Sequence, residues 1–384
     1  MDWKIPLADI DFGPEETEAV QQVLESRWLT MGPVTQVFEE EFASYLGVKH
    51  AIAVTNCTAA LHLACLAAGI GPGDEVIVPS LTFVATANAA RYTGALHIFA
   101  DIESLQDLCI SPETIQRCLT DRTRAIIVMH YGGYPCDMPG IMALASEHGL
   151  IVIEDAAHAL GSELNGCKLG TWGKIGCFSF FSNKNLTTGE GGMLVTDDDS
   201  IAEQLRLLRS HGMTAMTWDR HLGHAWSYDV VAFGYNYRID EIRSALGRVQ
   251  LAKLDKNNSA RQHLTACYRE ILHEEVPWVL QPFEKAQGVS ACHLFPILLP
   301  GNVGRESFME RMKVEGIQTS IHYPPVHKFK TYSRSGPSPQ GTLPVTEEVA
   351  LHEVTLPLYP TMCERQVEQV VQAIKGSSRP DDAE

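Results

Sequence analysis

The feature that most constrains the fold is a series of short apolar runs that alternate with helical stretches between residues 14 and 254. Strands that are continuously apolar are typical of a parallel sheet that is covered on both faces. Because helical stretches separate most of the runs, the pattern predicts an α/β fold with a large, mostly parallel open sheet. The runs are AIAVT (51–55), EVIVP (75–79), ALHIFAD (95–101), AIIVMHYG (125–132), LIVIED (150–155) and CFSFF (177–181).

A second, smaller unit follows the alternating region. Residues 254–272 predict a long helix that leaves the sheet, and the chain then contains several short strands, two helices and the loop SRSGPSPQG (333–341). We therefore divide the chain into a large α/β domain over 1–254 and a smaller C-terminal α+β domain over 255–384. Its polar tail, SSRPDDAE (377–384), is predicted to be disordered.

Composition and charge argue against several classes of function. The chain has 30 basic and 47 acidic residues, a formal net charge of −17, and would repel the phosphates of a nucleic acid. A DNA-binding regulator, which a gel-shift would reveal, needs a basic helix-turn-helix segment that we do not find. No apolar stretch approaches the ~20 residues that span a bilayer. The ten cysteines include no CxxC pair, which predicts that the chain has no metal site. The start of the chain has no export signal, so we expect the thiols to be reduced in the cytoplasm.

The common catalytic motifs are also absent. The sequence has no GxGxxG after a strand, no P-loop, no HExxH and no GxSxG. Nicotinamide-dependent, nucleotide-hydrolysing, zinc-protease and α/β-hydrolase activities therefore lack their usual sequence support.

Two ionisable residues stand at positions that suit a cofactor. Asp155 ends the run LIVIED, at the carboxyl end of a central strand, where open α/β sheets bind ligands. It either pairs with a cationic ring nitrogen or caps a loop or helix. Lys184 precedes NLTTGEGG in a loop between strand-like runs. A lysine desolvated there suits a Schiff base, whereas a solvated lysine beside a hairpin turn is the alternative.

Three further residues complete a recognisable set. Thr58 begins the predicted helix 58–69, so we expect it to cap that helix and to bind a phosphate there. Ser179 offers a second hydroxyl for the phosphate. Phe83 follows the strand 75–79 and either stacks on a flat ring or packs in the core. A lysine amine, a strand-end carboxylate, a phosphate site and an aromatic side chain together match pyridoxal 5'-phosphate.

The chain resembles the DegT/DnrJ/StrS family of pyridoxal-phosphate-dependent aminotransferases, most of which act on nucleotide-linked keto sugars. The resemblance covers nearly the whole chain and rests on several long motifs in the right order. It implies a fold-type I transferase. The motifs are GPVTQVFEEEFASYLGVKHAIAVTNCTAALHLA, GPGDEVIVPSLTFVATANAA, VIEDAAHALGSELNG, CFSFFSNKNLTTGEGG, GYNYRIDEIRSALGRVQL, GIQTSIHYPPVH and LPLYP.

The resemblance also implies a role for each matching residue. Lys184 would form the Schiff base and move protons, Asp155 would pair with the pyridine nitrogen, and His158 would lie beside the ring hydroxyl. Phe83 would stack on the ring, and Thr58, the backbone of Ala59, and Ser179 would hold the phosphate. Asn236, in GYNYR, would reach the phosphate bound by the other subunit of a homodimer, with the site at the interface.

The predicted reaction moves an amino group from an amino acid, expected to be glutamate, to a nucleotide-linked keto sugar in amino-sugar biosynthesis. A keto-cyclitol of the aminoglycoside type is an alternative acceptor. A dehydratase using the same cofactor is a weaker alternative, since such relatives have His where this chain has Lys184. The expected substrate residues are Arg238, His322, Tyr323 and His327, with Lys328 and Arg220 as further cations.

Two departures from the family pattern affect these predictions. Cys57 stands where the family usually has Gly before the phosphate-binding Thr, so it is expected to crowd the phosphate loop or to line the sugar pocket. The segment 211–231 is long and rich in aromatic residues. We interpret its pair His221 and His224 as solvated residues of a substrate loop rather than metal ligands.

Overall fold

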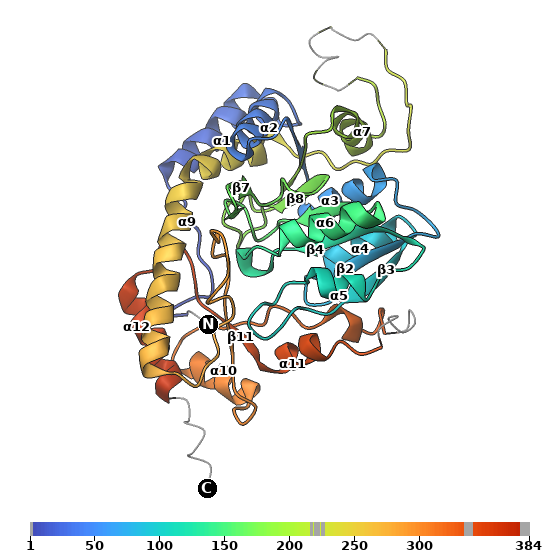
Figure 1. The fold of residues 1–384 in the computed structure, drawn as a ribbon. Helices are drawn as coiled ribbons and strands as arrows, with labels where there is room; N and C mark the ends of the chain where they lie inside the picture. The colour runs from blue at the N-terminus through green and yellow to red at the C-terminus, as the bar shows by residue number, and fades with distance from the viewer. Residues whose placement is uncertain (1–2, 216–217, 219–222, 224–226, 334–340, 377–384) are drawn as a thin grey trace.

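The computed structural model describes residues 3–215, 218, 223, 227–333 and 341–376. Its centre is a seven-stranded sheet with the strand order β1-β9-β8-β5-β4-β2-β3 (Figure 1). The pairs β2–β3, β2–β4, β4–β5 and β5–β8 are parallel, which confirms the mostly parallel sheet. The strands are β1 (His50–Val54), β2 (Glu75–Pro79), β3 (Leu96–Ala100), β4 (Thr123–Met129), β5 (Ile151–Asp155), β8 (Ile175–Ser179) and β9 (Gly192–Thr196).

One strand of the sheet, β9, lies outside the six apolar runs, and the sequence indicated only that a strand-like run follows the Lys184 loop. β9 runs antiparallel to both β8 and β1, so it reverses the chain direction at one side of the sheet. The loop 180–191 joins β8 to β9 and carries Lys184. Three predictions lie outside the described residues: the disordered tail, most of the loop 333–341, and the interpretation of Arg220, His221 and His224.

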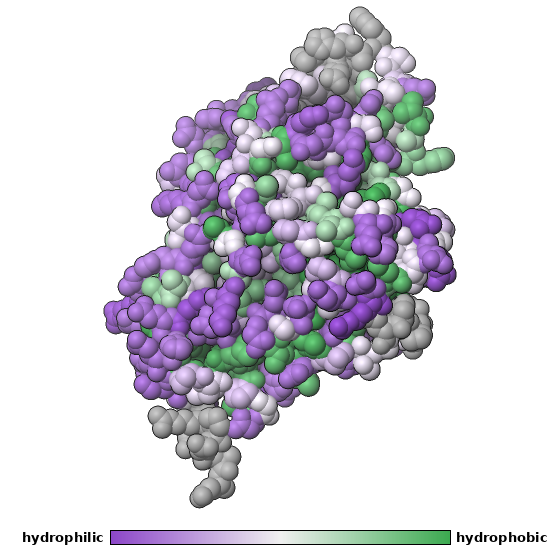
Figure 2. All heavy atoms as spheres, in the orientation of Figure 1, coloured by the Kyte–Doolittle hydropathy of each residue, from purple (hydrophilic) through white to green (hydrophobic). Residues whose placement is uncertain are grey.

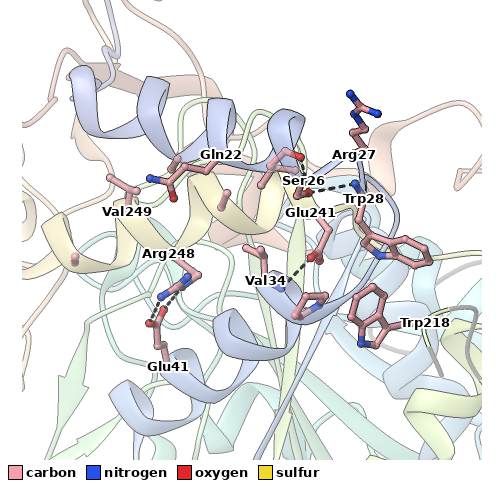
Figure 3. A pocket seen from close by; sticks show the side chains of 15 residues that line it. Gln22, Ser26, Arg27, Trp28, Val34, Glu41, Trp218, Glu241, Arg248 and Val249 are labelled. Atoms are coloured by element: carbon pink, nitrogen blue, oxygen red, sulfur yellow. Dashed lines mark hydrogen bonds and ion pairs between the residues drawn. The ribbon is translucent and has the colours of Figure 1, made fainter. Parts of the chain in front are cut away.

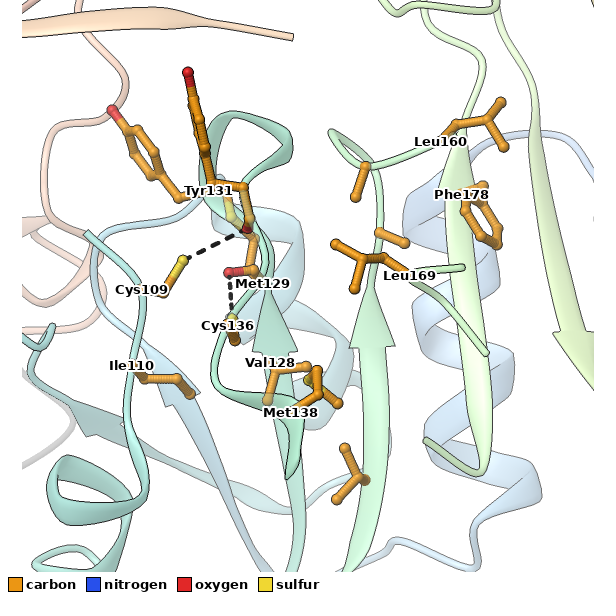
Figure 4. Close-up of a cluster of buried hydrophobic side chains, with 14 of the residues drawn as sticks. Cys109, Ile110, Val128, Met129, Tyr131, Cys136, Met138, Leu160, Leu169 and Phe178 are labelled. Carbon is orange, nitrogen blue, oxygen red and sulfur yellow. Dashed lines mark hydrogen bonds between the residues drawn. The ribbon is translucent and has the colours of Figure 1, made fainter. Parts of the chain in front are cut away.

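Helices cover both faces of the sheet because successive side chains of each strand point to opposite faces. In β1, Ala51 and Ala53 pack in a core with α2 and α6, whereas Ile52 and Val54 pack in a second core with α3, α4 and α7. The helices of this part are α1 (Pro14–Ser26), α2 (Pro33–Leu46), α3 (Cys57–Ala67), α4 (Val84–Tyr92), α5 (Pro112–Gln116), α6 (Met138–His148) and α7 (Asp199–Arg209), with the short η1 (Tyr131–Gly133). Figure 4 shows part of the first core, where the Cys136 thiol donates to the carbonyl of Met129 at 3.4 Å.

A 35-residue helix, α9 (Glu241–Glu275), connects the sheet to the C-terminal part (Figure 1). It contacts α1 and α2 near its start and α12 toward its end. The predicted boundary after residue 254 lies inside this helix, and the division into two domains stays a prediction. The C-terminal elements are β10 (Phe295–Leu298), α10 (Arg305–Val314), η2 (Val326–Lys328), α11 (Pro344–His352), β11 (Glu353–Leu356) and α12 (Glu364–Gly376).

The C-terminal part has a core of its own. The antiparallel pair β10–β11 packs with α9, α10 and α12 in a third cluster of buried side chains. Ile5, near the start of the chain, belongs to the same cluster and forms a bridge with Ile317. A short hairpin, β6 (Glu163–Leu164) and β7 (Cys167–Lys168), completes the fold. No helix of the described part is both long enough and apolar enough to cross a membrane.

Candidate active site

The carboxyl edge of the sheet brings the predicted cofactor residues together. Asp155 is the last residue of β5, and Gly192 pairs with both Val54 of β1 and Ser179 of β8. A Cβ atom added to Gly192 would lie only 2.6 Å from the carbonyl carbon of Asn56, just before α3. Glycine therefore permits β9 to approach the start of α3, so that Ser179 and this helix N-terminus flank one point of the sheet.

The N-terminus of α3 differs from the prediction in its cap. Asn56, not Thr58, is the N-cap residue, because Asn56 has an extended backbone and its Oδ1 accepts from the N–H of Ala59 at 2.8 Å. Thr58 is the second residue of the helix, and the prediction that it caps the helix is wrong. The N–H groups of Cys57 and Thr58 have no hydrogen-bond partner among the described residues. They leave the helix end able to bind an anion.

Asp155 is a buried carboxylate that neutral groups hold in place. The hydroxyl of Thr86 donates to its Oδ2 at 2.7 Å, and the N–H of Ala157 donates to its Oδ1 at 3.2 Å. Burial raises the pKa of Asp155, while these two hydrogen bonds and the charge of Lys184 oppose the rise. A cationic ligand group, such as a protonated ring nitrogen, would stabilise this carboxylate.

Lys184 lies half-buried in the loop between β8 and β9. Burial lowers the pKa of its amine to about 8, although the charge of Asp155 acts in the opposite direction. The Nζ atom lies 3.4 Å from Nε2 of His293, which is a neutral partner. An amine in this setting exists partly in the unprotonated, nucleophilic form near neutral pH.

His158 belongs to a buried aromatic cluster beside these residues. Its Nδ1 accepts from the N–H of Gly132 at 3.3 Å, so its Nε2 carries the proton and donates to the Tyr323 hydroxyl at 2.9 Å. Burial, with the charge of Lys184, holds the pKa of His158 well below its usual range. Phe83 caps this group from outside: it is 55% exposed, and its ring lies 6.1 Å from that of Tyr323. An exposed ring at this place is free to contact a flat ligand.

Sequence reasoning missed His293. Its ring lies 4.4 Å from that of His158, and it is the hydrogen-bond partner of Lys184. No sequence motif indicates a functional role for His293, because a single histidine before an apolar strand is most often a core residue. Its backbone N–H donates to the carbonyl of Gly132 at 2.9 Å, and this contact between distant segments holds it beside a lysine that is 109 positions away in the chain.

The predicted substrate residues do not form one group. His322 is fixed in the C-terminal part: Glu353 accepts from its backbone N–H at 2.9 Å, and its Nδ1 lies 2.8 Å from the Thr355 hydroxyl. His327 lies elsewhere, with Nδ1 2.6 Å from the Ser80 hydroxyl and Nε2 3.3 Å from Glu347. The structure therefore occupies both ring nitrogens of His327 with protein groups, and only Tyr323 contacts His158 directly.

Arg238 of the GYNYR motif lies beside the end of β1, whereas Asn236 of the same motif forms a bridge with Ser210, directly after α7. Arg238 forms a bridge with Val54 and donates to the Ser210 hydroxyl at 3.4 Å, and burial lowers the pKa of its guanidinium. The side chain of Asn236 is exposed on the surface of the protein. Close to it, four large apolar side chains are also exposed: Tyr228, Val230, Val231 and Phe233, the last of them 99%. Figure 2 shows apolar atoms at the margin of the surface where Figure 1 places the chain that follows α7.

Cys57 does not project from the helix end. Its side chain is buried in the second core with α3, α4 and α7. Burial and the nearby charge of Asp155 raise the pKa of its thiol well above the usual value. The thiol therefore stays protonated beneath the site.

A cavity of about 840 Å³ lies away from these residues, between α1, α2 and α9 (Figure 3). None of the residues that line it belongs to the predicted site. Trp28 and Trp218 meet edge to face at its rim, with ring centroids 4.7 Å apart. Arg248 and Glu41 form a bidentate ion pair inside it, at 2.8 and 2.9 Å.

One group of possible metal ligands occurs among the described residues, on α9 and α12. His263, Cys267 and Glu364 place their ligand atoms within 4.8 Å of one another. The side chains of His263 and Glu364 are each 63% exposed and already form an ion pair at 2.7 Å. That ion pair accounts for the arrangement, so we assign no metal to it.

Comparison with known proteins decides the family. The model of the DegT/DnrJ/EryC1/StrS aminotransferase family matches residues 11–375. The chain belongs to this family. It is 40% identical over 368 residues to the spore coat polysaccharide biosynthesis protein SpsC of Bacillus subtilis, and the match covers 94% of each chain.

Solved structures of the family agree with the fold. Helicobacter pylori PseC, an aminotransferase involved in the biosynthesis of pseudoaminic acid, superposes with a TM-score of 0.90 at 29% identity, over 97% of this chain and 98% of that one. The PLP form of the putative sugar aminotransferase Spr1654 from Streptococcus pneumoniae gives a TM-score of 0.90 at 25% identity, over 97% and 98% of the two chains. The chain is therefore a fold-type I, PLP-dependent aminotransferase.

The residues present fit that cofactor. The open N–H groups at the start of α3 suit a phosphate, the buried Asp155 suits a protonated ring nitrogen, and Lys184 offers a partly unprotonated amine. These three features lie at one edge of the sheet and come from three separate segments of the chain.

Proposed function

We propose that the enzyme transfers an amino group from an amino acid donor, glutamate, to a nucleotide-linked keto sugar. The observation that carries this proposal is the Lys184 amine, whose lowered pKa and neutral surroundings suit it to bind the cofactor. The names of two relatives support a sugar acceptor: one serves polysaccharide biosynthesis, and the other takes part in making pseudoaminic acid.

Each residue of the site has a distinct task in this proposal. Pyridoxal phosphate supplies a ring that takes up electron density from the reacting carbon. Asp155 would keep the proton on the ring nitrogen, and Lys184 would carry protons at Nζ. His158 remains neutral and orders the Tyr323 hydroxyl. Thr58 and Ser179 would hold the phosphate, and Phe83 would contact the ring. The lysine also favours transfer over dehydration, for which relatives have His.

The proposal that the amino acceptor is a sugar rests on which cationic side chains lie near the site. An aminotransferase for keto acids needs a fixed arginine that clamps a carboxylate bidentately. Arg238 is half-buried near the end of β1, and we assign it to the carboxylate of the amino donor. We further propose that His322 and Tyr323 face the sugar. His327, held by Ser80 and Glu347, would then position the segment rather than bind substrate.

A product assay tests the proposal. The enzyme is incubated with glutamate and a panel of keto sugars, with and without a nucleotide, together with a keto-cyclitol, and the aminated products are detected by mass spectrometry. A nucleoside diphosphate should inhibit, and the free sugars should react much more slowly. Equal turnover of a free sugar or the cyclitol would contradict the nucleotide requirement and favour the cyclitol alternative. The Lys184→Ala variant provides the blank.

We propose further that the working unit is a homodimer in which Asn236 completes the partner's site. The exposed apolar side chains at 228–233 support this, because a monomer would leave them in water. Mixing Lys184→Ala chains with Asn236→Ala chains should restore part of the activity, since one site of each mixed dimer carries both intact residues. Activity in a monomer on light scattering would contradict the proposal.

We place the reaction in the cytoplasm. All ten cysteines are free, and seven of them are buried, which suits a reducing compartment. Fractionation of cells that produce the protein, with a known cytoplasmic enzyme as reference, tests this placement.

A further inference from the structure

We infer that His293 is a positioning residue that holds the free amine of Lys184 through an unprotonated Nε2 atom. The inference rests on the proposed role of Lys184, but not on the identity of the sugar. Its basis is a chain of hydrogen bonds that runs from α9 through Asn185 and His293, both buried, to the half-buried lysine.

The first step fixes the orientation of the Asn185 amide. Its Nδ2 lies 2.8 Å from the carbonyl oxygen of Ala291 and 2.8 Å from Oδ1 of Asn258. A carbonyl oxygen only accepts, so the NH₂ group of Asn185 must point toward it. The Oδ1 of Asn185 therefore faces His293, at 2.9 Å from its Nδ1.

The second step fixes the tautomer of His293. Because Oδ1 of Asn185 accepts, Nδ1 of His293 must carry the proton. A neutral ring then has a lone pair at Nε2, and this atom faces the Lys184 amine at 3.4 Å. The amine can donate to it in either of its protonation states.

The surroundings keep the ring neutral. His293 is buried, and the titratable groups that face it from the neighbouring elements are Lys184, His158, Arg261 and His322, all of them basic and none of them an acid that would favour a charged ring. Burial and these groups hold the pKa of His293 well below its usual range. Protonation of Nε2, which would remove the lone pair, is therefore disfavoured at neutral pH.

The two histidines beside the lysine consequently have opposite tautomers. His158 accepts at Nδ1 and donates from Nε2 to Tyr323, whereas His293 donates from Nδ1 and accepts at Nε2. During an amino transfer the lysine is free for part of the cycle. His293 then holds Nζ through the side-chain hydrogen bond that the amine forms in the described part of the chain.

The first test reads the tautomer directly. In the cofactor-free protein labelled with ¹⁵N-histidine, the His293 ring at pH 7.5 should show a protonated Nδ1 and an unprotonated Nε2. The His293→Gln spectrum assigns the signal among the fifteen histidines. A cationic ring, or a proton on Nε2, overturns the inference whatever the substrate of the enzyme is.

The second test measures Lys184 in the cofactor-free protein. The ratio of its labelling rates at pH 7 and pH 10 reports its pKa and is insensitive to a general change of access. His293→Leu removes an acceptor that favours the ammonium form, so this ratio should rise roughly fivefold. Asn185→Asp, which favours a charged His293 ring, should do the same. His293→Gln keeps an acceptor and should leave the ratio close to the wild type.

A matched control and a kinetic readout complete the design. His263→Leu changes an exposed histidine of α9 and should not alter the ratio. In the loaded enzyme, His293→Leu should lower kcat about tenfold with a smaller change in KM, and His293→Gln should recover most of the loss. An unchanged ratio in His293→Leu overturns the inference. If the ratio shifts but no keto sugar is aminated, the acceptor proposal fails while the inference stands.

Discussion

The carboxyl edge of the sheet and the cavity between α1, α2 and α9 both hold charged side chains, but they arrange them differently. In the cavity, Arg248 and Glu41 neutralise each other through two hydrogen bonds. At the sheet edge, the contacts of Asp155 and Lys184 in the described chain are with neutral groups: Thr86, Ala157 and His293. The buried Glu241, which also lines the cavity, has both oxygens occupied by N–H groups at the start of α2, so the charges there hold helices together. The charges of Asp155 and Lys184 have fewer protein partners and are available to a ligand.

The strongest test of this comparison removes the reactive amine. Lys184→Ala should lower turnover at least ~1,000-fold, because the amine is needed to bind the cofactor and to move protons. The melting temperature without cofactor should change little, since the truncated side chain is only half-buried. Loss of the lysine with turnover intact would show that another residue performs this role.

The second test removes the negative charge beneath the site. Asp155→Asn keeps the shape and the hydrogen bond from Thr86 but cannot hold a proton on the ring nitrogen. Turnover should fall roughly 100-fold, and cofactor affinity, measured by fluorescence titration, should fall as well. Glu154, the preceding residue, faces His130 instead, at 3.0 Å. A Glu154→Gln variant should therefore affect stability more than cofactor affinity.

The third test uses pH. A lysine with the ordinary pKa of 10.5 gains about 100-fold in unprotonated amine between pH 7 and pH 9, whereas one with a pKa of about 8 gains about tenfold. The rate of Lys184 modification in the cofactor-free protein should therefore rise about tenfold over this range and level off above it. A rise that continues to pH 10 would mean that the amine is solvated.

The fourth test turns to the cavity. Glu241 begins α9 and accepts from the backbone N–H groups of Gly32, Val34 and Thr35 at the start of α2, at 2.8 to 2.9 Å. Glu241→Gln should destabilise the fold by about 2 kcal/mol, since it weakens buried hydrogen bonds at a helix N-terminus. The pH profile of Lys184 should stay the same. Denaturant unfolding and amine labelling, measured on one preparation, separate the two effects.

The smallest expected effect is at the rim of the same cavity. Arg27 ends α1 with a backbone φ of 59°, in the left-handed region that favours glycine. Arg27→Gly should raise the free energy of unfolding by about 0.5 kcal/mol without altering turnover. A loss of stability would instead indicate that the arginine side chain contributes to the packing around Trp28.

The sequence predicted the elements whose signal is local. The run 150–155 became β5 with Asp155 at its end, and the run 75–79 became β2 with the same bounds. The cap of α3 was misassigned because Asn56 and Thr58 are both good cap residues, and only the backbone conformation distinguishes them. The sequence indicated a strand-like run after the Lys184 loop but not the antiparallel pairing of β9, which depends on two neighbouring strands. His293 was missed because its place depends on hydrogen bonds to Gly132 and Asn185, which are distant in the chain.

Asn185 gives the loop that carries the lysine a mechanical connection to the rest of the molecule. Its amide binds Asn258 in the middle of α9, and Asn258 in turn donates to the carbonyl of Leu160 at 3.0 Å. The residue next to the reactive amine is thus tied to the helix that joins the two parts of the chain. A tilt of α9 relative to the sheet would displace Asn258 and, through its hydrogen bond, Asn185. The neighbouring Lys184 amine would then move as well.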